Sequence, residues 1–578
     1  MTTRRRLASG FVAAAAVLLF GRVSALLYAD HAWYDALGAV ALWRERIGDI
    51  VTIQLCFAVF AGLFALLNLS AIRRSIVSLA FPRRLGNVEF GEAVPRKILD
   101  RAAFVLAAGV AALMSLAVPS WDKLALVRAG VRFGETDPFF QMDIGFYTAW
   151  LPLESAAYVW CLALLILVSV IVTGLYALTP SLRWHRGAFQ VSVRVRRHLS
   201  VLASLFLLMM AWSYRLDGYE LLIKGSGPDG MFSYVDHQWL IPAYLSLSVG
   251  TVAAGALVIV SGWTGQLRAG FFTISAVLIF SVALDLILPS VVRRFAGTTA
   301  IAARERPYVA TRAAFTARAY GLPRNAPQPP PHEVTRFAAF ADSARIAKVM
   351  SSAKDSALVY PGAVGAALVL HGRQVAAPLL GTGLRRLALA WSEQRLDLAW
   401  STLPENARLA RNRDVRRRVR SLMPVFTQGS GVVPGYIGDT LVWIAELYSA
   451  SASYPLSRHY PLAGEERSYF RHSGTALVNS ATGRVTVVPS SSPDPTAVAW
   501  RARFPANIRP GGPDLLDELT SGPRQTESAS PGSASPASDA AFRTEVRRLF
   551  ARMRSALSAG DLMAFAAAYD SLGIIVGR

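Results

Sequence analysis

The stretch of sequence that decides the fold is Ala156–Leu178, which reads AAYVWCLALLILVSVIVTGLYAL. It contains no charged side chain, and a helix of this length crosses the roughly 30 Å hydrocarbon core of a bilayer. Six other stretches are apolar over a similar length: Gly10–Tyr28, Ile50–Ile72, Ala102–Pro119, Leu199–Tyr214, Ala243–Trp263 and Gly270–Val291. The sequence therefore predicts seven membrane spans within residues 1–292 and none after them.

The composition of the whole chain agrees with a membrane protein. Hydrophobic residues make up 53% of the 578 residues and charged residues only 17%, whereas about a quarter of the residues in a soluble domain are charged. The two cysteines, Cys56 and Cys161, both lie in predicted spans, and so few cysteines exclude a disulfide framework or a multi-cysteine metal site. These values exclude a soluble single-domain enzyme.

The basic residues predict an orientation for the spans. The chain carries 60 Lys and Arg against 38 Asp and Glu, a net charge of +22. The short loops on the side of the N-terminal tail hold more Lys and Arg than the opposite loops, and such loops usually stay in the cytoplasm. We therefore expect a multi-pass protein of the inner (plasma) membrane, with its N-terminus in the cytoplasm and its C-terminal half extracytoplasmic.

The first apolar stretch has an alternative interpretation as a cleaved signal peptide, because Arg4, Arg5 and Arg6 precede it. Arg22 interrupts the stretch and no small-x-small cleavage site follows, so we expect a retained helix. Arg22 and Asp285 are charges within the first and seventh predicted spans, at similar depths. Because an unpaired charge is costly in a membrane, they form a candidate ion pair. The alternative is that each side chain reaches the polar interface near its helix end.

One predicted outer loop carries a distinctive motif, Gly134–Tyr147, which reads GETDPFFQMDIGFY. It resembles the signature loop of uncharacterised protein family 0182, whose members are large bacterial membrane proteins with seven predicted spans and a big extracytoplasmic domain. Other blocks are similar to the same family: Asp217–Leu222, Glu305–Tyr308, Arg411–Asp414, Leu441–Glu446 and Tyr469–Ser473. The family has no established activity, so the resemblance implies a location and an architecture and no chemistry. Its members are usually longer, which implies that segments between Gly321 and Ala357 and after Pro505 are missing here.

The second half of the chain indicates separate folded regions. Prolines between positions 323 and 331 are typical of an extended linker, and the apolar segments around Ala481-Thr482-Gly483 predict a β-hairpin. The expected fold class is an α-helical polytopic membrane domain followed by a mixed α/β extracytoplasmic domain and a C-terminal helical hairpin. We expect five regions: a seven-helix transmembrane domain (1–292), a juxtamembrane segment with a Pro-rich linker (293–356), the mixed α/β domain (357–510), a Ser/Pro-rich disordered linker (511–540) and the hairpin (541–578).

Two groups of charged residues are candidate binding sites. Glu135, Asp137 and Asp143 of the outer loop could hold a cation, although a motif with Pro, Gly and aromatic residues is also typical of a packed structural loop. Arginines in the segment 408–422, which we expect to form a basic helix, are a candidate patch for an anionic lipid or an envelope polymer. The alternative is a solvated helix face whose charges pair with acids elsewhere. The patch consists of Arg411, Arg413, Arg416, Arg417, Arg418 and Arg420.

The sequence contains none of the common catalytic or cofactor motifs. There is no phosphate-binding GxxxxGK[ST], no nucleophile GxSxG and no zinc-binding HExxH, and His459 and His472 alone are weak indications of a metal site. We expect no cofactor, no metal and no nucleic-acid partner. The predicted function is a non-enzymatic cell-envelope scaffold, or an accessory subunit that contacts the lipid bilayer and other membrane proteins. The alternatives are a transporter or channel component, and an outer-facing enzyme on lipid-linked or wall substrates.

Overall fold

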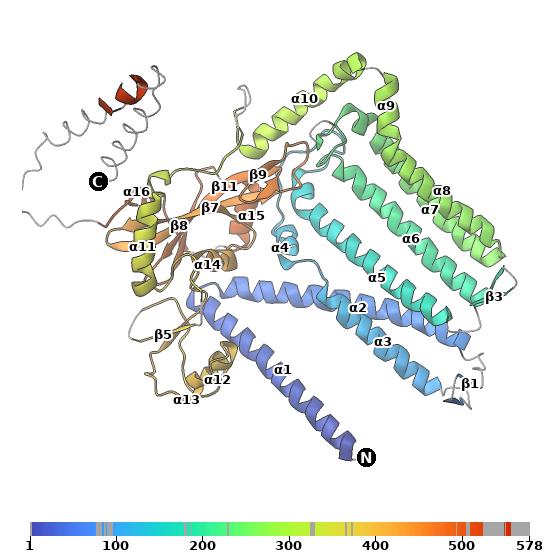
Figure 1. Cartoon of the computed structure of the whole chain (residues 1–578), viewed down its shortest axis with the longest axis horizontal. Helices are drawn as coiled ribbons and strands as arrows, with labels where there is room; N and C mark the ends of the chain where they lie inside the picture. Colours follow the sequence, from blue (N-terminus) through green and yellow to red (C-terminus); the bar gives the residue numbers. More distant parts are fainter. Residues whose placement is uncertain are drawn as a thin grey trace, which may run out of the picture. The chain divides into compact units, whose positions relative to one another are not determined.

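A computed structural model gives the fold of the chain (Figure 1). Its contacts divide the chain into a large unit, Met1–Pro523, and a small unit, Arg524–Arg578. In the small unit only helical residues at 548–555 are described, so the predicted helical hairpin of 541–578 lies almost entirely outside the described residues. The structure describes residues 3–76, 84–85, 88–89, 96–177, 182–185, 188–227, 230–296, 298–323, 330–364, 367–371, 374–492, 494–504, 509–523, 548–549 and 551–555.

Seven helices among the described residues are long and apolar enough to cross a membrane. Each predicted stretch falls on one of them, so the prediction of seven spans is confirmed. The last stretch ends earlier than expected, because α8 ends at Leu286 and a new helix, with Pro289 in its first turn, begins at Leu288. The helices are α1 (Thr3–Ala36), α2 (Val40–Ile76), α3 (Arg96–Leu116), α5 (Leu151–Ala177), α6 (Val193–Glu220), α7 (Ile241–Thr264) and α8 (Leu267–Leu286).

Helices α5 to α8 lie side by side (Figure 1). Small residues let α6 and α7 approach each other: Gly255 faces Ser204, and the Ser248 hydroxyl donates a hydrogen bond to the carbonyl of Ala211 (2.8 Å). Helix α1 runs apart from this group, and its Phe11 is 77% exposed. This exposure fits a side chain that faces lipid.

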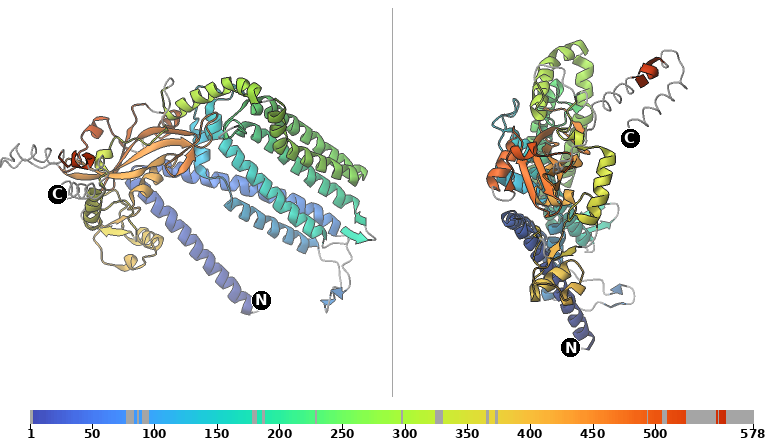
Figure 2. Two further views of the ribbon diagram at one scale, coloured as in Figure 1. Left: turned by 45° about the horizontal axis from the view of Figure 1, so that its top comes forward. Right: turned by 90° about the vertical axis from the view of Figure 1, so that its left-hand side faces the viewer.

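Short elements connect the spans. Strands β1 and β2 pair between α2 and α3, and β3 and β4 pair between α5 and α6. After the last span, α9 and then α10 lead back to the strand β11 of the C-terminal sheet (Figure 2). These elements are β1 (Arg84–Leu85), β2 (Val88–Glu89), α4 (Trp121–Ala129), the π-helical turn η1 (Phe146–Trp150), β3 (Leu182–His185), β4 (Ala188–Val191), the π-helical turn η3 (Asp236–Leu240), α9 (Leu288–Ala296) and α10 (Thr298–Tyr320).

Residues 330–523 form a domain around a five-stranded sheet, which we call the sheet domain. The strand order is β13-β12-β11-β8-β7, and all neighbours are antiparallel except β12 and β13. The predicted hairpin is confirmed as β11 and β12, and its Gly483 has a φ of +71°, which favours glycine. The strands are β7 (Thr427–Ile437), β8 (Thr440–Ser451), β11 (Tyr469–Asn479), β12 (Val485–Pro489) and β13 (Arg509–Pro510).

Helices and two small strand pairs surround this sheet, so the expected order of apolar helices followed by a mixed region is confirmed. The predicted basic helix of 408–422 is shorter than expected, because Asp414 caps a helix that begins at Val415 and residues 408–410 form a strand. The surrounding elements are η4 (Ala338–Phe340), α11 (Ser343–Ser356), β5 (Leu368–Leu370), α12 (Gly383–Ser392), α13 (Asp397–Trp400), β6 (Arg408–Ala410), α14 (Val415–Leu422), β9 (Tyr460–Leu462), β10 (Glu465–Arg467), α15 (Pro495–Arg503) and α16 (Asp514–Asp517).

The first part of the expected disordered linker of 511–540 is folded in the structure. It contains α16, and Leu516 and Leu519 join a cluster with Ile444 of β8. Thr520 also forms a β-bridge with Tyr436 of β7. Burial of these two leucines stabilises the folded segment, whereas residues 524–540 lie outside the described ones.

The two largest hydrophobic clusters extend from the spans into the sheet domain, and a smaller cluster joins Ala29 of α1 to Leu389 of α12. In the first, Trp33 and Tyr34 of α1 pack with Val419 of α14 and Trp443 of β8. In the second, Leu222, which follows α6, and the loop before α5 pack with Tyr454 and Tyr469. Because buried apolar area is the main source of stability, the spans and the sheet domain fold against each other as one unit.

Candidate functional site

The loop between α4 and α5 is built around Asp137, whose side chain is fully buried. Its Oδ1 accepts hydrogen bonds from the backbone N–H groups of Phe139 (2.9 Å) and Phe140 (2.6 Å). Its Oδ2 accepts from the N–H of Met142 (2.9 Å) and the hydroxyl of Tyr147 (3.0 Å). A buried carboxylate needs such donors to offset its lost hydration, so Asp137 holds the loop together.

The other two acids of this loop have partners of their own. Asp143 accepts hydrogen bonds from the backbone N–H groups of Phe133 (3.1 Å) and Gly145 (2.6 Å). Glu135 forms an ion pair with Arg318 of α10 at 2.6 Å. No group of three His, Cys, Asp or Glu within the described parts of the chain could hold a metal ion. This geometry favours the structural interpretation of the loop over the cation site.

Asp236 is a buried acid in the loop between α6 and α7 that the sequence reasoning did not select. It is fully buried in η3 and accepts hydrogen bonds from the N–H and hydroxyl groups of Ser226 (3.1 and 2.5 Å) and of Ser233 (2.8 and 2.9 Å). Glu305 of α10 accepts from the N–H of Tyr234 in the same loop (2.8 Å). The only signal in the sequence was that blocks around these residues resemble the family.

Arg418, from the predicted arginine patch, is fully buried on the inward face of α14. Its guanidinium donates to the carbonyl oxygens of Asn412 (3.1 Å), Gly483 (2.7 Å) and Arg411 (3.0 Å). It also lies 5.6 Å from the ring centre of Trp33 on α1, within range of a cation–π interaction. Burial lowers the pKa of the Arg418 guanidinium to about 10, so the group is still charged at neutral pH.

Three more arginines of the patch contact the protein itself. Arg411 pairs with Glu393 at 2.5 Å, Arg413 donates to a backbone carbonyl (2.9 Å), and Arg416 donates to the carbonyl of Gly429 (2.9 Å). The side chains of Arg417 and Arg420 are exposed. A polar cavity of about 490 Å³ lies beside the patch and includes Arg411, Arg413 and Arg417 in its lining. The structure therefore does not present the six arginines on one face.

Of the candidate pair Arg22 and Asp285, the structure describes only the side chain of Arg22, because that of Asp285 lies outside the described residues. Arg22 donates a hydrogen bond to the carbonyl of Trp391, at the end of α12. The neighbouring Gly21 allows this approach, because a side chain there would clash with the Trp391 ring. Arg22 is thus engaged by the sheet domain.

Polar contacts join the spans to the sheet domain beside the shared hydrophobic clusters. Glu45 of α2 forms an ion pair with Arg503 of α15 at 2.6 Å. The hydroxyl of Tyr34 donates to the carbonyl of Ser421 (2.9 Å), and the N–H of Leu456 donates to the carbonyl of Leu222. These contacts define a junction that includes α1, α2, α4, the start of α5, the end of α6, and the sheet.

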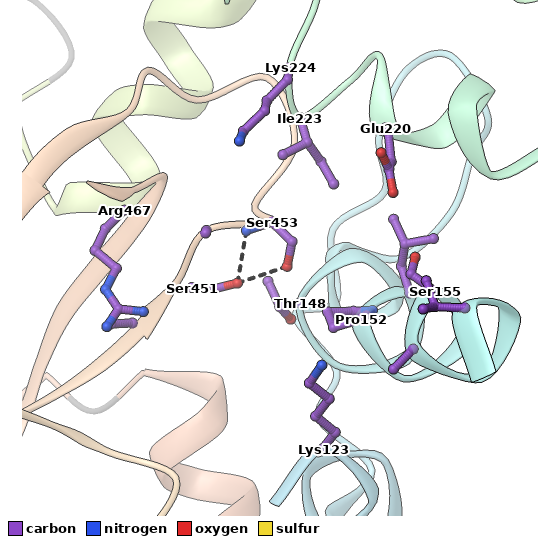
Figure 3. A pocket seen from close by; sticks show the side chains of 15 residues that line it. Lys123, Thr148, Pro152, Ser155, Glu220, Ile223, Lys224, Ser451, Ser453 and Arg467 are labelled. Carbon is purple, nitrogen blue, oxygen red and sulfur yellow. Dashed lines mark hydrogen bonds between the residues drawn. The ribbon is translucent and has the colours of Figure 1, made fainter. Parts of the chain in front are cut away.

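A cavity of about 600 Å³ lies within this junction. Figure 3 shows Lys123 of α4 and Lys224, beyond α6, directed into it from opposite sides, and Arg467 of β10 entering from the sheet. The hydroxyls of Ser451 and Ser453 lie between these cations and hydrogen-bond to each other at 2.8 Å. The opposite wall comes from the first turns of α5. None of these cavity residues was singled out from the sequence, because they come from five separate segments.

Three further polar residues of the sheet domain, Asp494, His459 and His472, have structural partners. Asp494 accepts hydrogen bonds from the hydroxyls of Ser449 (2.9 Å) and Ser473 (3.0 Å) and caps α15, as a turn residue would. His472 contacts Glu446 at 2.7 Å, whereas His459 contacts a backbone carbonyl at 3.2 Å. The two histidines therefore have different neighbours.

The fold and the junction define a multi-pass membrane protein in which a C-terminal sheet domain packs against seven apolar helices. The chain belongs to the family described as Uncharacterised protein family (UPF0182), which it matches over residues 7–350 and 373–519. The resemblance inferred from the loop Gly134–Tyr147 is therefore confirmed. The family description names no activity.

Three similar proteins carry the same family name. The UPF0182 protein of Desulforamulus reducens is 26% identical over 342 residues, which cover 56% of this chain and 37% of the relative. That of Moorella thermoacetica is 30% identical over 308 residues (51% and 33%), and that of Cupriavidus necator is 30% identical over 339 residues (57% and 36%). The chain thus covers about a third of the length of these curated relatives. No solved structure matches the chain.

Proposed function

We propose that this protein is a non-enzymatic scaffold or an accessory subunit of a membrane assembly in the cell envelope. The observation that supports it is the pair of hydrophobic clusters shared by the spans and the sheet domain. A protein that positions others at a membrane needs a domain whose orientation relative to its spans is fixed. Packing of Trp33 and Tyr34 against Val419 and Trp443 supplies such a connection.

The use of the charged residues supports the same proposal. Asp137, Asp143 and Arg418 make hydrogen bonds within the protein, whereas a catalytic acid or base must reach its substrate. The junction cavity has one carboxylate in its described lining, Glu220. An enzyme that used paired carboxylates would need a second carboxylate there.

In this proposal the N-terminus lies in the cytoplasm, and the sheet domain lies outside the inner membrane of a bacterial cell. The distribution of Lys and Arg among the loops supports this orientation. Alkaline phosphatase needs the oxidising exterior to become active. A fusion after Arg306 should therefore be active and a fusion after Arg84 inactive, and the reverse pattern would contradict the orientation.

Purification of the tagged full chain in a mild detergent tests the scaffold role. We expect a membrane or envelope protein to co-purify in a fixed stoichiometry. The partner should be retained by Arg420→Gln, which changes an exposed side chain, and lost from Trp33→Ala, which removes a ring from the shared cluster. Isolation of the wild-type chain without any stoichiometric protein partner would contradict the proposal.

A further inference from the structure

The junction cavity lies where the spans leave the membrane. Its wall includes Leu151, Pro152 and Val159 on the first turns of α5, and Val159 is 62% exposed on the surface of that span. Trp150, at the same end of the span, is 49% exposed, and exposed tryptophans are typical of the membrane–water interface. The cavity therefore opens beside the lipid leaflet on the side of the sheet domain.

Positive charge dominates the polar part of this cavity. Lys123, Lys224 and Arg467 come from three different elements, and the described lining holds one acid, Glu220. Among the described residues, neither lysine forms an ion pair. Arg467 pairs with the exposed Glu465 through Nη2 (2.6 Å), but its buried Nε has no hydrogen-bond partner. The cavity thus has donors and charge in excess of what the chain itself neutralises.

The hydrogen-bonding groups match those of a phosphate. Two ammonium groups and a guanidinium supply charge-assisted donors for phosphate oxygens. Ser451 and Ser453 add hydroxyls that now bond to each other (2.8 Å) and can turn toward a bound anion. The wall along α5 is mostly apolar: Leu151, Pro152, Ala156 and Val159 line it, together with the single polar residue Ser155. A ligand that fits both parts has a phosphate at one end and a hydrocarbon chain at the other.

We propose that this cavity binds the phosphate headgroup of an anionic phospholipid, whose acyl chain lies along the exposed face of α5. Lys123, Lys224 and Arg467 contact the phosphate, and Ser451 and Ser453 donate hydrogen bonds to it. The lipid bridges α4 and α5 of the membrane region to β8 and β10 of the sheet domain. This assignment does not depend on the scaffold role.

Native mass spectrometry of the full chain, titrated with phosphatidylglycerol or phosphatidylcholine in detergent, tests the proposal. We expect the wild-type protein to retain phosphatidylglycerol in preference to phosphatidylcholine. The double variant Lys123→Gln/Lys224→Gln should bind phosphatidylglycerol about thirtyfold more weakly, because it removes two cations that each contribute about fivefold to the binding of an anionic lipid. Both lysines lack ion pairs among the described residues, so the variant should keep the wild-type melting temperature.

Lys348→Gln/Lys354→Gln on α11 is the matched control, because it removes the same charge from two exposed lysines that line neither this cavity nor the cavity beside the arginine patch. It should bind phosphatidylglycerol like the wild type. Equal retention of the two lipids, or equal weakening in the two double variants, would overturn the proposal. Soluble glycerol phosphate should not compete at lipid-like concentrations. If it does, the cavity binds a free phosphate and the lipid assignment is wrong.

Discussion

Arg418 carries a buried positive charge whose hydrogen-bond acceptors are backbone carbonyls of three residues. It connects α14, the turn at Gly483 and the ring of Trp33 on the first span. From the sequence, Arg418 looked like its neighbours in the arginine patch. Arg418 points inward because of its position on α14, which begins directly after the capping residue Asp414. The sequence reasoning did not use this cap.

Replacement of Arg418 should be far more costly than replacement of its exposed neighbour. Arg418→Gln leaves buried carbonyl oxygens without donors, and we expect a loss of about 3 kcal/mol in the free energy of unfolding. Arg420→Gln should change it by less than about 0.5 kcal/mol. Thermal unfolding of the purified chain in detergent, followed by tryptophan fluorescence, measures both. Similar melting temperatures for the two variants would show that Arg418 does not hold the junction.

Replacement of Asp137 should likewise cost more stability than replacement of Glu135, although the two acids lie close together in the loop. Asp137→Asn replaces an acceptor oxygen with an NH2 group that would face the N–H donors of the loop, and we expect a loss of about 2 kcal/mol. Glu135→Gln breaks only a partly exposed ion pair with Arg318 and should cost less than about 1 kcal/mol. The same unfolding measurement distinguishes them. A larger effect at Glu135 would contradict the structural account of the loop.

At the scale of elements, α1 contacts both its neighbouring span α2 and helix α12 of the sheet domain. Local apolar runs were enough to predict all seven spans, because a span needs only length and hydropathy. They could not predict that α12 packs on α1, since this contact joins residues more than 350 positions apart and leaves no periodic signal. The same limit applies to the junction cavity.

The contact between α1 and α12 can be tested at Gly21. Gly21→Leu places a side chain where the Trp391 ring lies, and should lower the melting temperature by several degrees, as core overpacking of about 1–3 kcal/mol does. Gly10→Leu on the same helix meets no neighbour and should have no effect. Trp391→Ala in the Gly21→Leu background should restore part of the loss. Equal effects at Gly10 and Gly21 would mean that the two helices do not pack.

At the scale of the whole molecule, the sequence predicted a membrane half and a sheet-containing half but treated them as separate domains. The structure joins them through Trp33 and Trp443 in one cluster and Leu222 and Tyr454 in another. Composition could divide the chain, because spans and loops differ in hydropathy. Composition could not reveal that the two halves pack on each other at the junction, because aromatic residues at span ends are also typical of a lipid interface.

Cross-linking of the spans to the sheet domain tests the central claim, that the two pack directly on each other. Glu45 and Arg503 form an ion pair across the junction. We consider the variant Glu45→Cys/Arg503→Cys in a chain whose Cys56 and Cys161 are replaced by alanine, with a protease site inserted within residues 324–329. A short bismaleimide is added to intact membranes, and the chain is then cleaved at the new site.

We expect the two fragments of Glu45→Cys/Arg503→Cys to stay together on a denaturing gel. Gly10→Cys/Arg503→Cys should separate, because Gly10 lies about 39 Å along α1 from Ala36 at the junction end of the helix, at a rise of about 1.5 Å per residue. Separation of the fragments in both variants would contradict the claim that the sheet domain is packed on the spans.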